Sequence, residues 1–368
     1  ALDVLARVED DGAYANLVLS PMLERSGLDV TDRGFVTDLV YGTLRRQRAL
    51  DHLVDRFLTS APPPAARRAL RVGAYQLVFR DDIPTYAAVS ATVDAAPKRF
   101  RGLVNAVLRK VAGAPVAYPD VATELSYPDW MVSLLRTDLG AEVADAALRS
   151  MNESASATVR ADGYTQDLGS QMVAELVGAS DGEVVLDLCA APGGKATAMA
   201  LGGAVVVAAD LQPQRVGLIR RNVERLGAER VVAVVADAAH APFRPGGADR
   251  VLLDAPCSGL GVLRRRPDAR WRLDAGVVPR LAELQRRLVD AAVELVRPGG
   301  VLVYSVCTLS AAEGREVDEH IAVHHPELEP LPQPDGPWEP SGRGALLLPQ
   351  AAGTDGMFVA RYRVPTAS

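Results

Sequence analysis

The sequence predicts a multidomain chain, with an all-helical part at the N-terminus followed by a Rossmann-like α/β part. In residues 1–112, apolar side chains recur at three- and four-residue spacing, without the alternation typical of strands. From residue 183 onward, β-rich runs alternate with helical stretches, a pattern typical of a doubly wound parallel sheet covered on both faces. The length of 368 residues is enough for two or three separate cores.

Composition excludes several classes of protein. The chain is 48% apolar, but no run approaches the ~20 apolar residues that span a bilayer, and no secretion signal is recognisable. Three cysteines do not make a disulfide framework and fit a reducing compartment. Five scattered histidines without a CxxC pair argue against a metal site. We therefore expect a cytoplasmic monomer that binds neither a metal nor a membrane.

Charge is unevenly distributed along the chain. The net charge is −6, yet residues 1–115 hold 16 Lys and Arg against 13 Asp and Glu. Only Lys98, Lys110 and Lys195 of the 40 basic residues are lysine. Arginine favours forked contacts to phosphate, but a GC-rich genome produces the same bias, so both explanations stay open.

The helical part is expected to contain six helices, interrupted by Pro62–Pro64 and by Pro84. Their expected ranges are Leu2–Val8, Phe35–Leu44, Leu50–Leu58, Ala65–Phe79, Tyr86–Ala96 and Leu103–Val111. Six arginines on these helices fit either a phosphate-binding surface or an ordinary solvated face: Arg45, Arg46, Arg48, Arg67, Arg68 and Arg71. We expect this domain to cover residues 1–115.

Residues 116–182 are expected to form a connector, and 183–368 the α/β domain. Within the connector, one helix is expected from Trp130 to about Leu148 and another over Ser170–Val177. The expected strands of the α/β domain are Val184–Leu188, Val205–Ala209, Val231–Ala236, Arg250–Leu253 and Val301–Val306, with late strands at Leu328–Leu331 and Met357–Val364. Helices are expected at about 196–201, 213–226, 279–296 and 311–323.

The stretch Val184–Lys195, VVLDLCAAPGGK, reads as a strand, a glycine turn and a helix N-terminus. Glycines let a backbone approach a ligand closely, and the first helical N–H groups are free donors. The turn is neither the GxGxxG fingerprint nor a phosphate loop, and a merely connecting turn is the alternative. The candidate ligand-binding residues are Cys189, Ala190, Ala191, Pro192, Gly193, Gly194 and Lys195.

Acidic residues follow three of the expected strands, where a parallel sheet places its ligands. Asp210, after the second strand, suits the two hydroxyls of a ribose, although it also suits the start of the next helix. Asp237, after the third strand, lies where an adenine amino group is expected, and Asp254 ends the fourth strand.

All three cysteines also lie at expected strand ends. A single cysteine is most often a small buried apolar residue. That explanation is weaker for Cys257 in PCSG and Cys307 in VCTLS, because both lie in polar turns at the same edge of the sheet as Cys189.

The stretch Leu263–Arg272, LRRRPDARWR, combines five arginines with one tryptophan. Basic residues with an interleaved aromatic suit a nucleic acid with unstacked bases, and a solvated charged loop is the alternative. The candidate RNA-binding residues are Arg264, Arg265, Arg266, Arg270 and Trp271.

Taken together, these stretches resemble a known family. DLCAAPGGK, DAPCSGLGVLRRRPDARW and YSVCTLS, in this order, resemble the ribosomal RNA cytosine-5 methyltransferases of the Sun/Fmu type. AYANLVL, DRGFVTDLVYGTLRR and FRGLVNAVLRK resemble the NusB-like helical domain attached to their bacterial members, and DGMFVARYR matches a late strand.

The resemblance implies S-adenosylmethionine as cofactor, bound by the 189–195 turn, Asp210, Asp237 and Asp254. It implies Cys307 as nucleophile, Cys257 as the residue that helps to release product, and a cytosine of 16S ribosomal RNA, free or in an assembling small subunit, as target. Chemically, a thiolate that adds to carbon 6 of cytosine activates carbon 5. Asp254 is then suited to hold the proton that neutralises charge at ring nitrogen 3, and Lys195 is suited to orient the base or the cofactor.

One departure from the family lies near 150–170, where members carry about fifty further residues. The junction Ala157–Gln166 is abrupt, which favours residues omitted from the sequence over a natural deletion.

Three alternatives remain. In the first, the chain is an RNA-binding adaptor in transcription or ribosome assembly with a vestigial catalytic domain. In the second, it methylates another RNA such as tRNA. An amino-group methyltransferase is disfavoured, because it is expected to carry an NPPY-type turn where this chain has DAPC.

Overall fold

The structure, a computed structural model, describes residues 1–155 and 158–366. These residues form two compact units, each described here by itself. The helical unit comprises Ala1–Ser133 together with Leu263–Leu273, and the sheet unit comprises Leu134–Val262 with Asp274–Ser368. The observed units differ from the expected domains in two ways: the connector is divided between them, and an internal stretch of the second half belongs to the helical unit.

The helical unit confirms the predicted all-α fold. Its helices are α1 (Leu2–Asp10), α2 (Ala15–Glu24), α3 (Val30–Arg45), α4 (Gln47–Asp55), α5 (Pro64–Phe79), α6 (Thr85–Ala95), η1 (Lys98–Phe100), α7 (Arg101–Gly113), α8 (Val121–Leu125) and η3 (Pro267–Trp271). The sequence pattern missed α2, because this helix buries only Ala15 and Leu19 and leaves Leu17 65% exposed.

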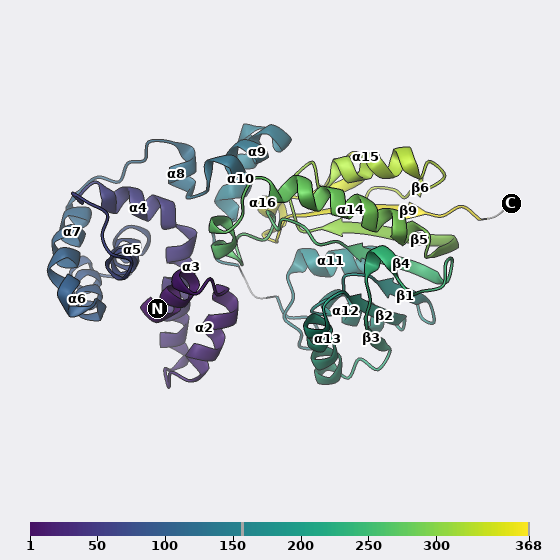
Figure 1. Cartoon of the computed structure of the whole chain (residues 1–368), viewed down its shortest axis with the longest axis horizontal. Helices are drawn as coiled ribbons and strands as arrows, with labels where there is room; N and C mark the ends of the chain where they lie inside the picture. The colour runs from purple at the N-terminus through teal and green to yellow at the C-terminus, as the bar shows by residue number, and fades with distance from the viewer. Residues whose placement is uncertain (156–157, 367–368) are drawn as a thin grey trace. The chain divides into compact units, whose positions relative to one another are not determined.

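Helix α5 is the centre of the helical unit, where it packs against α1, α3, α4, α6 and α7 (Figure 1). Two glycines allow the closest of these approaches. A Cβ atom on Gly42 of α3 would lie 2.1 Å from the Tyr75 ring, and one on Gly73 of α5 would lie 2.3 Å from Leu108 of α7. Larger residues at either position would push these helices apart.

The arginines of α5 serve ion pairs within the helical unit. Asp51 accepts hydrogen bonds from Arg71 at 2.7 and 2.8 Å and from Arg67 at 3.3 Å. Glu9 of α1 pairs with Arg71 at 2.7 Å and with Arg68 at 3.2 Å. These guanidinium groups are therefore matched by carboxylates, which favours a structural role over the phosphate-binding surface considered from the sequence.

The stretch Leu263–Leu273 packs onto the helical unit, whose apolar core lies within residues 1–111. The Arg270 side chain is fully buried there, with its guanidinium carbon 3.8 Å from the centre of the Tyr127 ring. Its nitrogens donate to the carbonyl oxygens of Arg45 and Ser126 and to the Tyr127 hydroxyl. Burial lowers the pKa of Arg270 to about 10, although the Tyr127 hydroxyl opposes this shift. The buried Arg270 guanidinium thus contacts carbonyl oxygens and an aromatic ring within the helical unit.

The sheet unit contains a mixed sheet of nine strands within the described residues. Its strands are β1 (Val184–Asp187), β2 (Val205–Asp210), β3 (Val231–Val235), β4 (Ala248–Asp254), β5 (Val296–Val306), β6 (Glu329–Pro330), β7 (Trp338–Ser341), β8 (Gly344–Leu347) and β9 (Met357–Arg363). The order is β3-β2-β1-β4-β5-β9-β8-β7, with β6 paired to β9. The first five strands pair in parallel, as predicted. The pairs β5–β9, β9–β8 and β8–β7 are antiparallel. The chain order changes direction between β1 and β4, where open α/β sheets bind their ligands.

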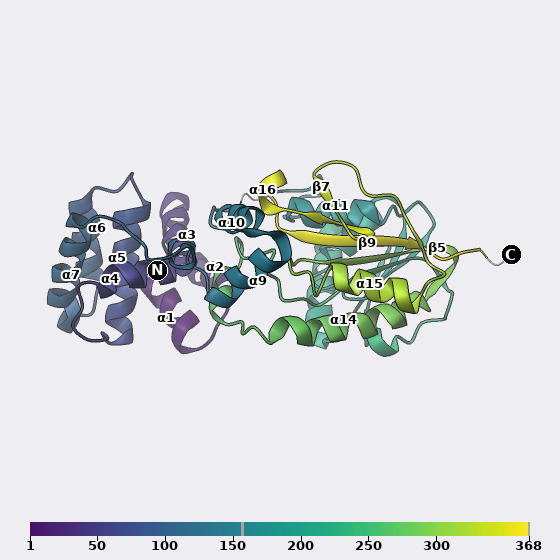
Figure 2. The same cartoon turned by 90° about the horizontal axis from the view of Figure 1, so that it is seen from above.

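Helices cover both faces of this sheet (Figure 2). They are α9 (Asp129–Leu139, which begins in the helical unit), α10 (Ala141–Ser150), α11 (Leu168–Leu176), α12 (Gly194–Leu201), α13 (Pro213–Leu226), η2 (Ala238–His240), α14 (Val277–Val293), α15 (Arg315–His324) and α16 (Pro349–Ala352). In β5, Leu302, Tyr304 and Val306 pack with α14 and α15, and the alternate residues Val301 and Val303 pack with α11 and α12. This period of two fixes which face each strand residue joins.

One sequence prediction needs adjustment in the sheet unit, and another falls outside the described residues. The single helix expected from Trp130 to Leu148 is divided into α9 and α10 at Gly140, whose φ of +82° ends the first helix. Ala157, which opens the abrupt junction noted in the sequence, lies outside the described residues. No helix in the described ranges is long and apolar enough to cross a bilayer.

We expect Arg270→Met to destabilise the helical unit by about 2–4 kcal/mol, because buried carbonyl groups would lose their donor. The measurement is the free energy of unfolding by urea denaturation. Arg266→Met is the matched control, because Arg266 is exposed on the same stretch, and this change should stay within about 0.5 kcal/mol. Equal stability of both variants and the wild type would contradict the structural role of Arg270.

Candidate active site

The glycine turn between β1 and α12 forms one wall of the candidate site. Gly193 has a φ of +101°, a conformation that side chains disfavour, and it stands directly before α12. A Cβ atom on Gly194 would lie 3.0 Å from the Tyr164 ring and 3.3 Å from the Gln166 amide. Both glycines are therefore required by the local backbone and packing, and close approach of this turn to a ligand stays a prediction.

Asp187, the last residue of β1, carries a buried carboxyl group at this turn. The residue is 1% exposed, and within the described part of the chain neither carboxylate oxygen makes a hydrogen bond. Burial raises the pKa of Asp187 to about 8, with a further contribution from the negative charge of Asp254 and an opposing one from Lys195. A buried carboxyl without a partner is costly unless a bound group compensates it, so Asp187 favours a cationic ligand here.

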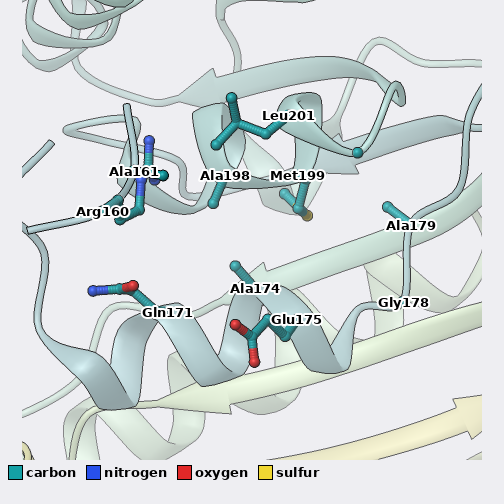
Figure 3. A pocket seen from close by; sticks show the side chains of 11 residues that line it. Arg160, Ala161, Gln171, Ala174, Glu175, Gly178, Ala179, Ala198, Met199 and Leu201 are labelled. Carbon is teal, nitrogen blue, oxygen red and sulfur yellow. The ribbon is translucent and has the colours of Figure 1, made fainter. Parts of the chain in front are cut away.

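Arg160 holds the glycine turn through hydrogen bonds. Its guanidinium donates to the Gly194 carbonyl at 2.5 Å, to Gln166 at 2.8 Å and to Thr197 at 3.0 Å, and it pairs with Asp162. Arg160 also lines a pocket of about 280 Å³ between α11 and α12 (Figure 3). The Arg160 guanidinium is therefore occupied by contacts that hold the glycine turn in place.

Asp210 is the last residue of β2, and Asp237 lies two residues beyond β3, so both stand at strand ends as the sequence predicts. The Asp210 side chain is buried, accepts a hydrogen bond from the Gln212 amide at 3.1 Å and lies 3.4 Å from the Arg215 guanidinium. Asp237 is more exposed and accepts from the Ala239 amide at 2.9 Å, which is the largest of the contributions that lower its pKa. Both carboxylates stand at the same sheet edge as the glycine turn, where a nucleoside would lie.

A partly buried ion pair lies at the end of β4. The Lys195 ammonium is 2.6 Å from one Asp254 oxygen, and the Ser305 hydroxyl donates to the other, also at 2.6 Å. Burial lowers the pKa of Lys195, but the charge and hydrogen bond of Asp254 outweigh it, so that this pKa lies above its ordinary value. Lys195 is therefore a cation held in place by a carboxylate that β4 positions.

The two cysteines that the sequence singles out face one another. The Cys257 and Cys307 sulfur atoms are 3.2 Å apart, as in a thiol hydrogen bond. Cys257 follows β4 and Cys307 follows β5, and these strands pair in parallel up to Asp254 and Ser305. Cys189, the third cysteine, is half-buried two residues beyond β1, and its pKa is raised by burial first and then by Asp187.

The surroundings of the two thiols separate their acidities. The hydrogen bond from Cys257 lowers the pKa of Cys307, and the Lys195 cation acts in the same direction against burial and Asp254. The pKa of Cys257 is raised by its interaction with Cys307, by burial and by the negative charge of Glu313. Cys307 is thus the more acidic of the two thiols and Cys257 the less acidic.

The predicted RNA-binding residues do not share one environment. Arg264 and Arg270 are 5% and 0% exposed, which argues against direct contact of their side chains with RNA. The half-buried Trp271 donates its indole N–H to the Leu44 carbonyl at 2.7 Å. Arg265 and Arg266 are exposed, and for them RNA contact stays a prediction.

Sequence reasoning missed three residues that shape the site. Asp187 was visible as the acid that ends the first strand, but it was not included among the candidates. Arg160 and Glu313 carried no recognisable signal, because one precedes a turn and the other was expected in the first turn of a solvated helix.

Comparisons with known proteins agree with this geometry. The family model described as 16S rRNA methyltransferase RsmB/F matches residues 174–363, and the NusB family model matches residues 1–113. A ribosomal RNA small subunit methyltransferase B from Thermus thermophilus is 38% identical over 396 residues, which covers 99% of this chain and 96% of the relative.

A second relative is a probable ribosomal RNA small subunit methyltransferase B from Bacillus subtilis, 32% identical over 436 residues, with 99% of this chain and 97% of the relative covered. This alignment is longer than the 368 residues of the chain, so the relative contains residues that this chain lacks. Among solved structures, PH0851 superposes with a TM-score of 0.79 at 22% identity, covers 98% of this chain and 96% of its own, and shares the fold.

The family match covers the sheet, the glycine turn and both cysteines, and the N-terminal match covers the helices from α1 to α7. S-adenosylmethionine is the cofactor of this family, and the glycine turn and the unpartnered Asp187 fit a cationic nucleoside. The chain belongs to the RsmB/F family of S-adenosylmethionine-dependent 16S rRNA methyltransferases and carries a NusB-family domain at its N-terminus.

Proposed function

We propose that this enzyme methylates carbon 5 of a cytosine in 16S ribosomal RNA through a covalent bond between Cys307 and the base. The observation that carries the proposal is the pair of thiols 3.2 Å apart beside the Lys195–Asp254 ion pair. Two cysteines of unequal acidity suit a reaction that needs one nucleophile and one proton carrier.

Cys307 supplies the nucleophile in this proposal. Carbon 5 of cytosine is weakly nucleophilic until a thiolate adds to carbon 6, which gives the ring enamine character. S-adenosylmethionine, when bound, supplies an electrophilic methyl group. The Lys195 cation and the Cys257 hydrogen bond both favour the thiolate of Cys307.

Asp254 and Cys257 serve the ring and the release of product. The Asp254 carboxylate, held by Lys195 and Ser305, suits a hydrogen bond to the proton that ring nitrogen 3 takes up when the thiolate adds to carbon 6. After methylation, the proton on carbon 5 must leave, and the bond between Cys307 and carbon 6 must break with its electron pair on sulfur. Cys257, in contact with the Cys307 sulfur, suits donation of its proton to that departing sulfur, and the thiolate left on Cys257 suits uptake of the carbon-5 proton.

The cofactor is assigned to the carboxyl ends of β1, β2 and β3. Asp210 suits the ribose hydroxyls, and Asp237 suits the adenine amino group. The buried Asp187 carboxyl suits a cationic group of the cofactor, which would supply the partner that this side chain lacks among the described residues.

We expect Cys307→Ala to abolish methyl transfer, because no thiolate would activate the ring. Cys257→Ala should instead retain the first bond-forming step and accumulate a covalent enzyme–RNA adduct. Transfer of tritiated methyl groups to unmodified small-subunit RNA, with denaturing gels, measures both outcomes. Complete loss of adduct in Cys257→Ala, with retention in Cys307→Ala, would reverse the two roles.

The Lys195 cation should set the pH dependence of Cys307. The pKa of Cys307 is lowered in the protein, so its alkylation by iodoacetamide should rise with pH at lower values than for an ordinary cysteine. Lys195→Met removes a positive charge that stabilises the thiolate, so the midpoint should move to higher pH. Mass spectrometry of the labelled peptide identifies the thiol that reacts. An unchanged midpoint would remove Lys195 from this role.

Asp187 should make cofactor binding depend on pH. The pKa of Asp187 is raised to about 8, so much of this carboxyl is protonated at pH 6 and more of it ionises as pH approaches 8. Only the ionised form attracts a cationic group, so affinity for S-adenosylmethionine should rise over this interval. Isothermal titration calorimetry measures the affinity, and Asp187→Asn should bind more weakly and without this rise. A flat profile in the wild type would contradict the assignment.

A further inference from the structure

A buried carboxylate joins the two loops that carry the cysteines. Glu313 lies on the turn between β5 and α15 and is fully buried. It accepts hydrogen bonds from the Ser258 amide at 2.7 Å, from the Ser258 and Thr308 hydroxyls, and from the Gln285 amide at 3.1 Å. One side chain therefore binds both loops and α14.

The two hydroxyl groups that bond Glu313 belong to residues next to the two cysteines. Ser258 directly follows Cys257, and Thr308 directly follows Cys307. Their hydroxyl oxygens are 3.1 Å apart, so they form a second bridge between the same two loops beside the pair of sulfur atoms. Whatever holds Ser258 against Thr308 also limits how far the two thiols can separate.

Glu313 is itself fixed from two sides. The Tyr304 hydroxyl, on β5, donates to the Glu313 carbonyl at 2.5 Å, so the backbone of the turn is tied to the strand that precedes Cys307. Gln285 on α14 donates both to Glu313 and to the Pro256 carbonyl, one residue before Cys257, at 2.9 Å. The carboxylate thus has little freedom to follow either loop if that loop moves.

We propose that Glu313 is a positioning residue that holds the Cys257 loop against the Cys307 loop, so that product release follows methyl transfer. Glu313 hydrogen-bonds neither thiol among the contacts of the described residues, and it acts through Ser258 and Thr308. The part of this inference that concerns release rests on the proposed function. The part that concerns the distance between the thiols does not.

The charge of Glu313 supports the same division of roles. Its negative charge contributes to the raised pKa of Cys257, after the effects of Cys307 and of burial. Burial raises the pKa of Glu313 itself, and the four hydrogen bonds that it accepts oppose this shift. Several donors around one carboxylate favour its ionised form.

Phenylarsine oxide tests the thiol spacing without any RNA. The reagent condenses with two neighbouring thiols, forms two As–S bonds and releases one molecule of water, so it requires both sulfur atoms at close range. We expect the wild type to bind one equivalent tightly at this pair. Glu313→Ala should bind at least tenfold more weakly, and Glu313→Gln, whose amide can still join Ser258 and Thr308, should recover part of the affinity.

Methyl-transfer kinetics tests the release step. Glu313→Ala should keep a measurable first turnover, slow later turnovers at least tenfold and accumulate the covalent RNA adduct on denaturing gels, as Cys257→Ala should. Glu313→Gln should show less adduct. If Glu313→Ala does not fold, Gln285→Leu, which loses the donor to Glu313 and to Pro256, should show the same kinetic pattern.

Asp318→Ala is the matched control. Asp318 is 1% exposed on α15 and bonds Arg343 and Tyr362 rather than either cysteine loop. Its loss should lower the melting temperature without weakening arsenical binding or trapping RNA.

Three results would overturn the inference. They are unchanged arsenical affinity in Glu313→Ala, weakened affinity in Asp318→Ala to the same degree, or loss of the first turnover in a folded Glu313→Ala without adduct. A wild type that binds the arsenical as expected but methylates no RNA would instead overturn the proposed function.

Discussion

The parallel pairing of β4 with β5 is the constraint on which the active site depends. Leu253 lies opposite Tyr304 and Asp254 opposite Ser305, and the Ala255 amide still donates to the Ser305 carbonyl just beyond the last pair. Because the loops leave the sheet in this register, Cys257 meets Cys307 and Ser258 meets Thr308. A shift of one residue would turn the alternate side chains of a strand to the opposite face, so the register that builds the core also pairs the thiols.

Much of the site was predictable because a parallel sheet gathers the carboxyl ends of its strands. That rule placed Cys189, Asp210, Asp237 and Asp254 at one edge before any coordinates were known. The contact between Cys257 and Cys307 did not follow from sequence spacing alone, since it requires β4 and β5 to be neighbours in register. The antiparallel pair β7 and β8 was also missed, because each strand is only four residues long.

The arginines show why charge patterns alone mislead. Arg270 and Arg266 look equivalent in the sequence, yet one is enclosed by carbonyl groups and an aromatic ring and the other faces solvent. Sequence spacing records charge but not the partners that satisfy it, which come from residues more than a hundred positions away. In the sheet unit, too, the Asp254 carboxylate has a cationic partner in Lys195, whereas the Asp187 carboxyl has no hydrogen-bond partner among the described residues. Only the folded environment creates this difference.

The membership of Leu263–Leu273 in the helical unit has a consequence for biosynthesis. Arg270 bonds the Arg45 carbonyl across a sequence separation of 225 residues. During translation, the N-terminal helices therefore emerge long before the segment that supplies Arg270. Domains usually fold in the order in which they leave the ribosome, and the apolar core of this unit lies within residues 1–111, but its contacts with Arg270 form only after β1 to β4 have been made. For that part of synthesis, the carbonyl groups of Arg45 and Ser126 lack their Arg270 donor.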